Sequence, residues 1–381
     1  MNRWKNLKNI LIIRLDNMGD LVMSIPAINA LKETFQCKLT LLTSSAAEPI
    51  TPLIPSIDEV IIYNAPWMKN RDELSTKEMI RLIGLLEMKK FDAAVLFTVF
   101  SQNPLPAMML AYWANIPLRL AYCRENPYEL LTDWVPDMEP YCFIRHQVRR
   151  DLELLNHVGV QTCNESIAIS LPAWAWSSAQ AKLKAAGVDV SHPYVILHPG
   201  VSEVKRQYSL DGWIEVAKKL KRCSNLQIIL TGIDKERALA EEIKRRSGDA
   251  VFSVAGELSL EEFIMTIHHS QLVISVNTST VHIAAAVQTK LVVLYAMTNP
   301  QHIPWKASGM ILPFEVPQDR QSKNEVLRYV VQNYFPPYAI IVSPQQIVNA
   351  AMVVLHEDYQ KPIPETFDFK LLVRGFHNVM N

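Results

Sequence analysis

The chain has 381 residues, of which 49% are apolar and 20% charged, a composition typical of a globular protein rather than a disordered one. This length exceeds what one hydrophobic core usually serves, so we expect two domains. The 38 Lys and Arg residues balance 38 Asp and Glu residues, so no overall positive charge marks nucleic acid as a partner.

The five cysteines are scattered and form no C-x-x-C pair, which predicts neither a zinc site nor a disulfide framework. Residues 1–9 lack the apolar core and cleavage site of a signal peptide, and no run is long and apolar enough to span a bilayer. We therefore expect a cytoplasmic protein. The apolar stretch 104–113 is a candidate for peripheral contact with the inner membrane, although we favour a buried helix there.

In the first half of the chain, short apolar runs alternate with amphipathic segments, as in a parallel sheet covered by helices. Strands are expected at 10–13, 39–42, 59–63 and 93–97, and helices after residue 20 and at 77–90 and 145–157. Pro26 falls inside the first of these helices, which is therefore either kinked or starts later.

The alternation is lost over 162–176 and then restarts, which marks a domain junction. Strands are expected at 194–197, 227–231, 251–254, 272–275 and 290–295, and helices at 213–222, 235–246, 260–268 and 346–356. We predict two Rossmann-like doubly wound α/β domains, at 1–172 and 173–350, that face a central cleft. The tail, 351–381, is a candidate to pack back on the first domain. No G-x-G-x-x-G fingerprint is present, which counts against a dehydrogenase.

The polar sequence NTST at 277–280 lies between a buried strand and an Ala-rich helix that carries His282. Asn277, Thr278, Ser279 and Thr280 suit a helix N-cap, and the N–H groups of a first helical turn attract anions such as phosphate. An ordinary well-capped turn is the alternative. For His282 we expect a hydrogen-bonding role, because its cationic form is disfavoured at a helix N-terminus.

A second cluster follows the strand at 194–197. Gly200 permits a close backbone approach, and Ser202, Lys205 and Arg206 are candidates to bind phosphate oxygens, with a solvated basic loop as the alternative. In the next strand-to-helix loop, Gly232 and Glu236 are candidates to face a nucleoside, unless Glu236 is a surface charge at a helix start.

In the first half, Asp20 follows Gly19 in the first strand-to-helix loop, where a carboxylate serves either as a helix cap or as a catalytic base. Asp16, earlier in the same loop, is either a second acid or a plain loop residue, and we favour the plain loop residue. Thr298, Asn299, His302 and Trp305 follow another strand, and we expect Trp305 to pack in the core.

Three blocks together resemble the glycosyltransferase family 9 enzymes, the heptosyltransferase group that builds the lipopolysaccharide inner core. Residues 10–28 are similar to that family's N-terminal strand, G-D loop and proline-containing helix. Residues 195–206 resemble its phosphate-binding loop, and residues 273–300 resemble its D-T-G/S-x-x-H-x-A-A-A block with the following turn.

The resemblance implies a GT-B fold, a nucleotide-diphosphate sugar held mostly by the second domain, and inversion at the anomeric carbon without an essential metal or cofactor. It makes Asp20 the general base and Lys205 the phosphate-binding lysine, and it places Thr278, Ser279 and His282 at the start of the donor-binding helix. The family commonly has Asp where this chain has Asn277, so the donor need not be ADP-heptose. The expected acceptor is a cell-envelope glycan or a lipid-linked saccharide.

Two other functions are also compatible with the amino-acid sequence. A nucleotide-sugar epimerase of the same fold would convert the donor with no acceptor present. A protein that binds a nucleotide sugar or glycan without turnover is compatible with Asn277, although Asp20 and Lys205 count against it.

Overall fold

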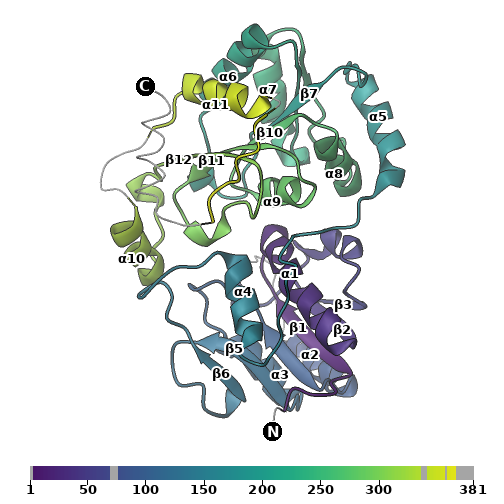
Figure 1. Cartoon of the computed structure of the whole chain (residues 1–381), viewed down its shortest axis with the longest axis vertical. Coiled ribbons are helices and arrows are strands. Elements are labelled where there is room, and N and C mark those ends of the chain that lie inside the picture. Colours follow the sequence, from purple (N-terminus) through teal and green to yellow (C-terminus); the bar gives the residue numbers. More distant parts are fainter. Residues whose placement is uncertain (1–2, 69–75, 336–340, 357, 366–381) are drawn as a thin grey trace. The chain divides into compact units, whose positions relative to one another are not determined.

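The computed structural model describes residues 3–68, 76–335, 341–356 and 358–365. The chain divides into two compact units, Met1–Ser170 and Leu171–Asn381 (Figure 1). Each unit contains a six-stranded sheet in which all neighbouring strands are parallel. The predicted doubly wound α/β architecture is confirmed in both units.

The first sheet has the order β3-β2-β1-β4-β5-β6. Its central strand β1 is buried on both faces, because its run of Ile and Leu meets a helix layer on each side. The strands are β1 (Asn9–Arg14), β2 (Lys38–Thr43), β3 (Glu59–Ile62), β4 (Ala93–Leu96), β5 (Leu118–Cys123) and β6 (Asp133–Pro136).

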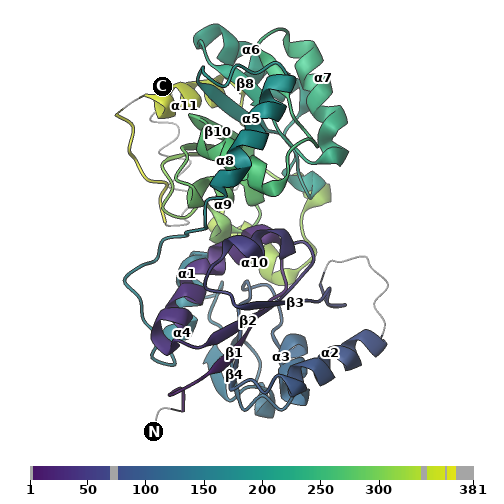
Figure 2. The ribbon, with the colours of Figure 1, turned by 90° about the vertical axis from the view of Figure 1, so that its right-hand side faces the viewer.

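Helices cover both faces of this sheet, as Figure 2 shows. On one face α1 (Met18–Phe35) packs beside α4 (Gln147–Asn156), and on the other α2 (Thr76–Met88) packs beside α3 (Leu105–Trp113). Helix α1 begins directly after Asn17 and runs through Pro26, so the alternative of a later start is excluded. In α3 the residues Ala107, Met108, Leu110 and Ala111 are buried, whereas Met109, Tyr112 and Trp113 are exposed, so this helix is buried on one face only.

The second sheet has the order β12-β11-β10-β7-β8-β9. Its strands are β7 (Tyr194–His198), β8 (Gln227–Leu230), β9 (Val251–Ser253), β10 (Leu272–Val276), β11 (Leu291–Ala296) and β12 (Gly309–Phe314). The helices of this unit are α5 (Trp176–Ala185), α6 (Leu210–Cys223), α7 (Arg237–Ser247), α8 (Leu260–His268), α9 (Ser279–Ala286), α10 (Glu325–Tyr334) and α11 (Pro344–Leu355). A large apolar core joins α6, α7 and α11 to one face of the sheet.

The chain beyond residue 350 continues the second unit as far as the structure describes it. Helix α11 crosses that position and buries Ile347, Ala351 and Val354 against α6 and the sheet. Beyond the helix, Ile363 N–H donates to Ala307 O at 2.7 Å, and Tyr359 OH donates to Gly309 O at 3.0 Å. Residues 366–381 of the expected tail lie outside the described residues. None of the helices in the described ranges has both the length and the apolarity that a bilayer span requires.

Candidate active site

The carboxyl end of β1 carries a cluster of buried charge. Arg14, the last residue of the strand, is fully buried, and its side chain forms ion pairs with two aspartates of the following turn. Its Nε lies 3.3 Å from Asp16 Oδ2, and its Nη2 lies 3.6 Å from Asp20 Oδ1. No hydrogen-bond partner for the three guanidinium nitrogens lies among the described residues, so the cation is balanced by nearby charge rather than by close hydrogen bonds.

Asp20 is held at the third position of α1. Its Oδ2 accepts a hydrogen bond from the backbone N–H of Asn17 at 3.2 Å, so the carboxylate does cap the helix. The side chain keeps 12% of its surface exposed. Capping and catalysis are therefore compatible here, because a carboxylate held by a backbone N–H and a guanidinium still has surface that a substrate hydroxyl can reach.

Two further carboxylates surround Arg14, one from the loop and one from α4. Asp16 accepts a short hydrogen bond from Gln102 Nε2, while Asp151 accepts from Ser24 Oγ and Gln147 Nε2, both at 2.7 Å. Burial raises the pKa of Asp16 and that of Asp151 to about 6 each. Burial acts to lower the pKa of Arg14, but the three carboxylates outweigh it and raise that pKa above its ordinary value.

At the carboxyl end of the second sheet, Glu236 and two glycines form one group. The Glu236 carboxylate accepts from the backbone N–H of Ile233 at 2.9 Å and lies over both Gly200 and Gly232. A Cβ on Gly200 would overlap this carboxylate, and a Cβ on Gly232 would come within 3.0 Å of it. The sequence-predicted residues Gly200, Gly232 and Glu236, from two different loops, therefore come together.

The basic loop after β7 meets the start of α9. Lys205 Nζ and Arg206 Nη2 lie 3.1 and 3.3 Å from Glu203 Oε2, and Arg206 Nη1 donates to Asn277 O at 3.0 Å. The buried Arg206 Nε has no hydrogen-bond partner among the described residues. Ser202 is exposed on the same loop.

Helix α9 begins at Ser279, with Thr278 as its N-cap residue. The Thr278 Oγ1 atom is buried and makes no hydrogen bond to any residue that the structure describes. Thr280 and His282 lie in the first turns and are buried. Arg206 Nε and Thr278 Oγ1 are thus two unsatisfied buried polar groups beside a helix N-terminus, an arrangement that suits a bound anion.

The Asn277 side chain bonds the protein's own backbone. Its Oδ1 accepts from Ala296 N–H at 3.1 Å, and its Nδ2 donates to Ala296 O at 3.3 Å. An amide can satisfy both backbone groups at once, whereas an ionised carboxylate can only accept. Asn277 therefore joins the ends of β10 and β11 in this structure.

Other polar residues at the carboxyl end of the second sheet make contacts within the protein. His198 Nδ1 lies 2.9 Å from Thr231 Oγ1, and burial lowers the pKa of His198 to about 4, so its imidazole is neutral at physiological pH. Trp305 is buried, as the packing interpretation expects, and Asn299 contacts His302 at 3.2 Å. Across the described ranges, no three His, Cys, Asp or Glu side chains gather as a metal-binding group.

A family model described as glycosyltransferase family 9 (heptosyltransferase) matches residues 79–328, which is more than half of the chain. The chain belongs to glycosyltransferase family 9. It is therefore a glycosyltransferase. Lipopolysaccharide heptosyltransferase 3 of Escherichia coli is 25% identical to it over 327 residues, which cover 82% of this chain and 92% of that protein. The residues matched by the family model do not include Asp20.

Solved structures show the same GT-B fold as this family 9 chain. A glycosyl transferase family 9 protein from Veillonella parvula superposes with a TM-score of 0.74 at 17% identity, over 92% of this chain and 98% of that one. The E. coli ADP-heptose lps heptosyltransferase II superposes with a TM-score of 0.66 at 19% identity, over 91% and 98% of the two chains.

Within the charged cluster of this family 9 enzyme, sequence reasoning singled out Asp20 alone. Arg14, Gln102 and Asp151 were not singled out, and Asp16 was interpreted as a plain loop residue. One signal was available: Arg14 directly extends a strand of four consecutive apolar residues, where a charged side chain is buried and needs partners. Gln102 and Asp151 gave no such signal, because their part in the cluster depends on tertiary contacts.

Proposed function

We propose that this family 9 enzyme is an inverting glycosyltransferase that moves a sugar from a nucleotide-diphosphate donor to a cell-envelope glycan or lipid-linked saccharide. Its relatives are lipopolysaccharide heptosyltransferases, and one is described with ADP-heptose, so heptose from ADP-heptose is the first donor to test. The observation that carries the proposal is the Asp20 carboxylate, which keeps 12% of its side-chain surface exposed and is held beside Arg14 at the carboxyl end of β1.

In the proposed reaction, Asp20 accepts the proton of the acceptor hydroxyl while that oxygen bonds to the anomeric carbon. The bond from the anomeric carbon to the diphosphate breaks on the opposite face, and its electron pair leaves with the diphosphate. Configuration at the anomeric carbon inverts because attack and departure occur on opposite faces. A positioned base of this kind contributes about 10²–10⁴-fold to the rate.

The leaving diphosphate needs positive charge, which the loop after β7 supplies. In the structure, Glu203 pairs with Lys205 and Arg206. A diphosphate carries more charge than one carboxylate and can displace Glu203 from these cations. The Arg206 Nε atom, the Thr278 hydroxyl and the N–H groups at Ser279 and Thr280 would complete the anion site. We propose that these groups stabilise the departing diphosphate without a metal ion or cofactor.

Glu236 is proposed to bind the donor's nucleoside part. Its carboxylate is fixed by the Ile233 N–H, and a carboxylate is a strong acceptor for the hydroxyls of a ribose. Gly200 and Gly232 leave the space that this carboxylate occupies.

The test combines donor binding with turnover. Thermal stabilisation by ADP, UDP, GDP and ADP-heptose is measured with EDTA or with Mg²⁺, and sugar transfer from ADP-heptose to truncated lipopolysaccharides is measured for wild type, Asp20→Asn and Asp20→Ala. We expect metal-independent stabilisation by one nucleotide in all three proteins, and transfer about 10²–10⁴-fold slower in both variants. Asp58→Asn is the control, because this carboxylate pairs with Lys32 at a more exposed position of the same unit.

Three results would contradict parts of the proposal. Wild-type transfer by Asp20→Ala would remove Asp20 as the base. Conversion of the donor without any acceptor would favour an epimerase. Binding that requires Mg²⁺ would overturn the metal-free anion site.

A further inference from the structure

Arg14 is shared by two carboxylates that have different surroundings. Asp16 contacts its Nε and Asp20 contacts its Nη2, so each acid pairs with a different nitrogen of one guanidinium. The Asp16 side chain is 8% exposed, against 12% for Asp20. Asp16 is therefore not a plain loop residue, because its negative charge offsets part of the positive charge that Arg14 would otherwise direct at Asp20.

Gln102, in the loop after β4, fixes the Asp16 carboxylate. Its Nε2 donates to Asp16 Oδ1, and its Oε1 accepts from the Val99 N–H at 3.2 Å. A backbone N–H can only donate, so the amide oxygen must face Val99 and the amide N–H₂ must face Asp16. The orientation of Gln102 is thus determined by its own loop.

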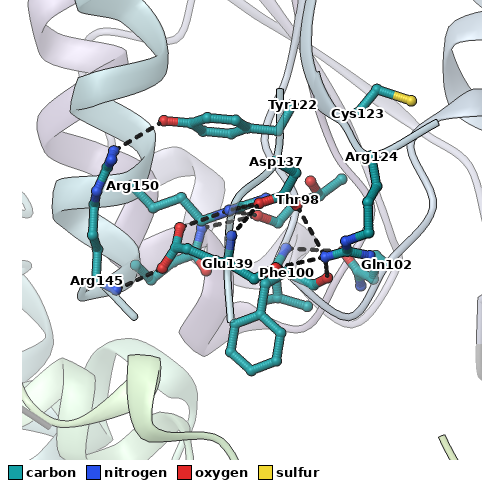
Figure 3. Close-up of polar contacts among 12 residues, drawn as sticks. Thr98, Phe100, Gln102, Tyr122, Cys123, Arg124, Asp137, Glu139, Arg145 and Arg150 are labelled. Carbon is teal, nitrogen blue, oxygen red and sulfur yellow. Dashed lines mark hydrogen bonds and ion pairs between the residues drawn. The ribbon is translucent and has the colours of Figure 1, made fainter. Parts of the chain in front are cut away.

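Two arginines hold the backbone of that loop, as Figure 3 shows. Arg150 Nε donates to Thr98 O at 2.9 Å, and Arg124 Nη2 donates to Phe100 O at 2.8 Å. Arg150 is in turn held by Asp137 and Glu139, at 2.8 and 2.7 Å. These contacts are all buried or half-buried, so the loop that carries Gln102 has little freedom to move.

We propose that Asp16 is a positioning residue for Asp20: held by Gln102, it engages Arg14 so that the cation orients Asp20 without neutralising it. This inference rests on the proposed role of Asp20 as the base. When Asp16 is ionised, its negative charge offsets part of the Arg14 cation, so the Asp20 carboxylate is stabilised less and accepts a proton more readily. When Asp16 is protonated, Arg14 turns wholly to Asp20 and turnover falls.

The surroundings of Asp16 make this dependence measurable. The charged or titratable groups near it are Arg14 on β1, Asp20 on α1, and Asp151 and Arg150 on α4, the last two acting through Arg14. Burial raises the pKa of Asp16 to about 6, while the hydrogen bond from Gln102 acts to lower it. Loss of that hydrogen bond should therefore raise the pKa of Asp16 further.

The experiment measures kcat and KM for sugar transfer from about pH 5 to about pH 9 in wild type, Asp16→Asn and Gln102→Met. Wild type should lose activity as the pH falls through about 6. Asp16→Asn should be about 10- to 100-fold slower in kcat at alkaline pH, with donor KM nearly unchanged, and should lack the inflection. Gln102→Met should keep the inflection but move it to higher pH.

Ser44→Ala is the matched control, because it removes a 2.5 Å hydrogen bond to the backbone carbonyl of Asp16 and leaves the carboxylate untouched. It should keep the wild-type pH profile. If Asp16→Asn is unstable, Gln102→Met still tests the role of Asp16, because Gln102 is only half-buried.

Asp20→Asn, measured in parallel, distinguishes a failure of the positioning role of Asp16 from a failure of the base assignment of Asp20. If Asp20→Asn is inactive while Asp16→Asn keeps wild-type kcat and its inflection, the positioning role is overturned and the inflection belongs to Asp151, whose partners are Ser24 and Gln147. If Asp20→Asn itself is fully active, the base assignment fails instead. An unmoved inflection in Gln102→Met would also contradict the proposal.

Discussion

The Glu236 carboxylate occupies the space beside Gly200 in which any other residue would place its Cβ. Glu236 is held there by the N–H of Ile233, at 2.9 Å. Gly200 is thus required by a neighbouring side chain, since its φ is not among the positive values found at other glycines. The requirement links the loop after β7 to the loop after β8, and both follow strands that pair in the second sheet.

Gly200→Ala should weaken nucleotide binding about tenfold or more, because the added methyl group displaces the carboxylate proposed to bind the ribose. Titration of the preferred nucleoside diphosphate by calorimetry would measure this. Gly84→Ala is the control, because no atom lies within 4 Å of a Cβ built there, and Ala in a helix should stabilise the fold by about 0.5–1 kcal/mol. Equal affinity in Gly200→Ala and wild type would show that Glu236 does not contact the nucleotide.

Asn277→Asp should destabilise the protein by about 1–3 kcal/mol, although the family commonly has Asp at this position. The substitution leaves Ala296 O without its donor and sets an ionised oxygen against that carbonyl. Urea unfolding followed by fluorescence would give the difference in the free energy of unfolding. Increased stability would mean that the amide of Asn277 does not bond Ala296 in solution.

Arg150→Met should lower the free energy of unfolding by about 3–5 kcal/mol, because it leaves Asp137 and Glu139 buried without their main cation. It also removes one of two hydrogen bonds to the Thr98 carbonyl, the other coming from Gln147 Nε2 at 3.2 Å, so sugar transfer should slow as the Gln102 loop loosens. Arg245→Ala, which breaks an exposed pair with Glu242, should leave urea unfolding unchanged. Similar unfolding curves for the two variants would contradict a structural role for the Arg150 network.

The sequence predicted the fold far better than the site contacts. Strand β1 and most other central strands were recognisable because burial on both faces demands continuous apolar runs. Strands β5, β6 and β12 were missed. The apolar run of β5 is interrupted by Arg119, β6 is a four-residue edge strand ending in Pro136, and β12 contains Gly309 and Pro313, which ordinarily argue against a strand.

At the site, the sequence indicated which loops matter but not which atoms meet. Glu236 and Gly200 were each proposed for a ligand, yet their mutual contact depends on the pairing of β7 with β8. Asn277 was compared with the family's Asp, and only the geometry shows its amide on Ala296. Asp16 was set aside because nothing nearby in the sequence predicts that Gln102, 86 residues later, donates to it.

His198 should make the protein less stable in acid. Burial lowers its pKa from the ordinary 6.5 to about 4, so the folded state keeps a neutral ring while the unfolded state takes up a proton. Its contribution is fully present above about pH 6.5 and is lost as the pH falls toward 4, a difference on the order of 3 kcal/mol. Asp16 and Asp151 act in the opposite sense, because their raised pKa values stabilise the fold at low pH and that contribution is lost as the pH rises through about 6.

These opposing effects are separated by comparing variants, since the aspartates are common to all of them. His198→Gln keeps a polar partner for Thr231 but cannot titrate. Its free energy of unfolding should therefore fall less than that of wild type between about pH 7 and 4.5, while exposed His157→Gln should follow the wild-type curve. If His198→Gln and wild type lose stability in parallel over this range, His198 is protonated in the fold, and its ring must face solvent or an acid in solution.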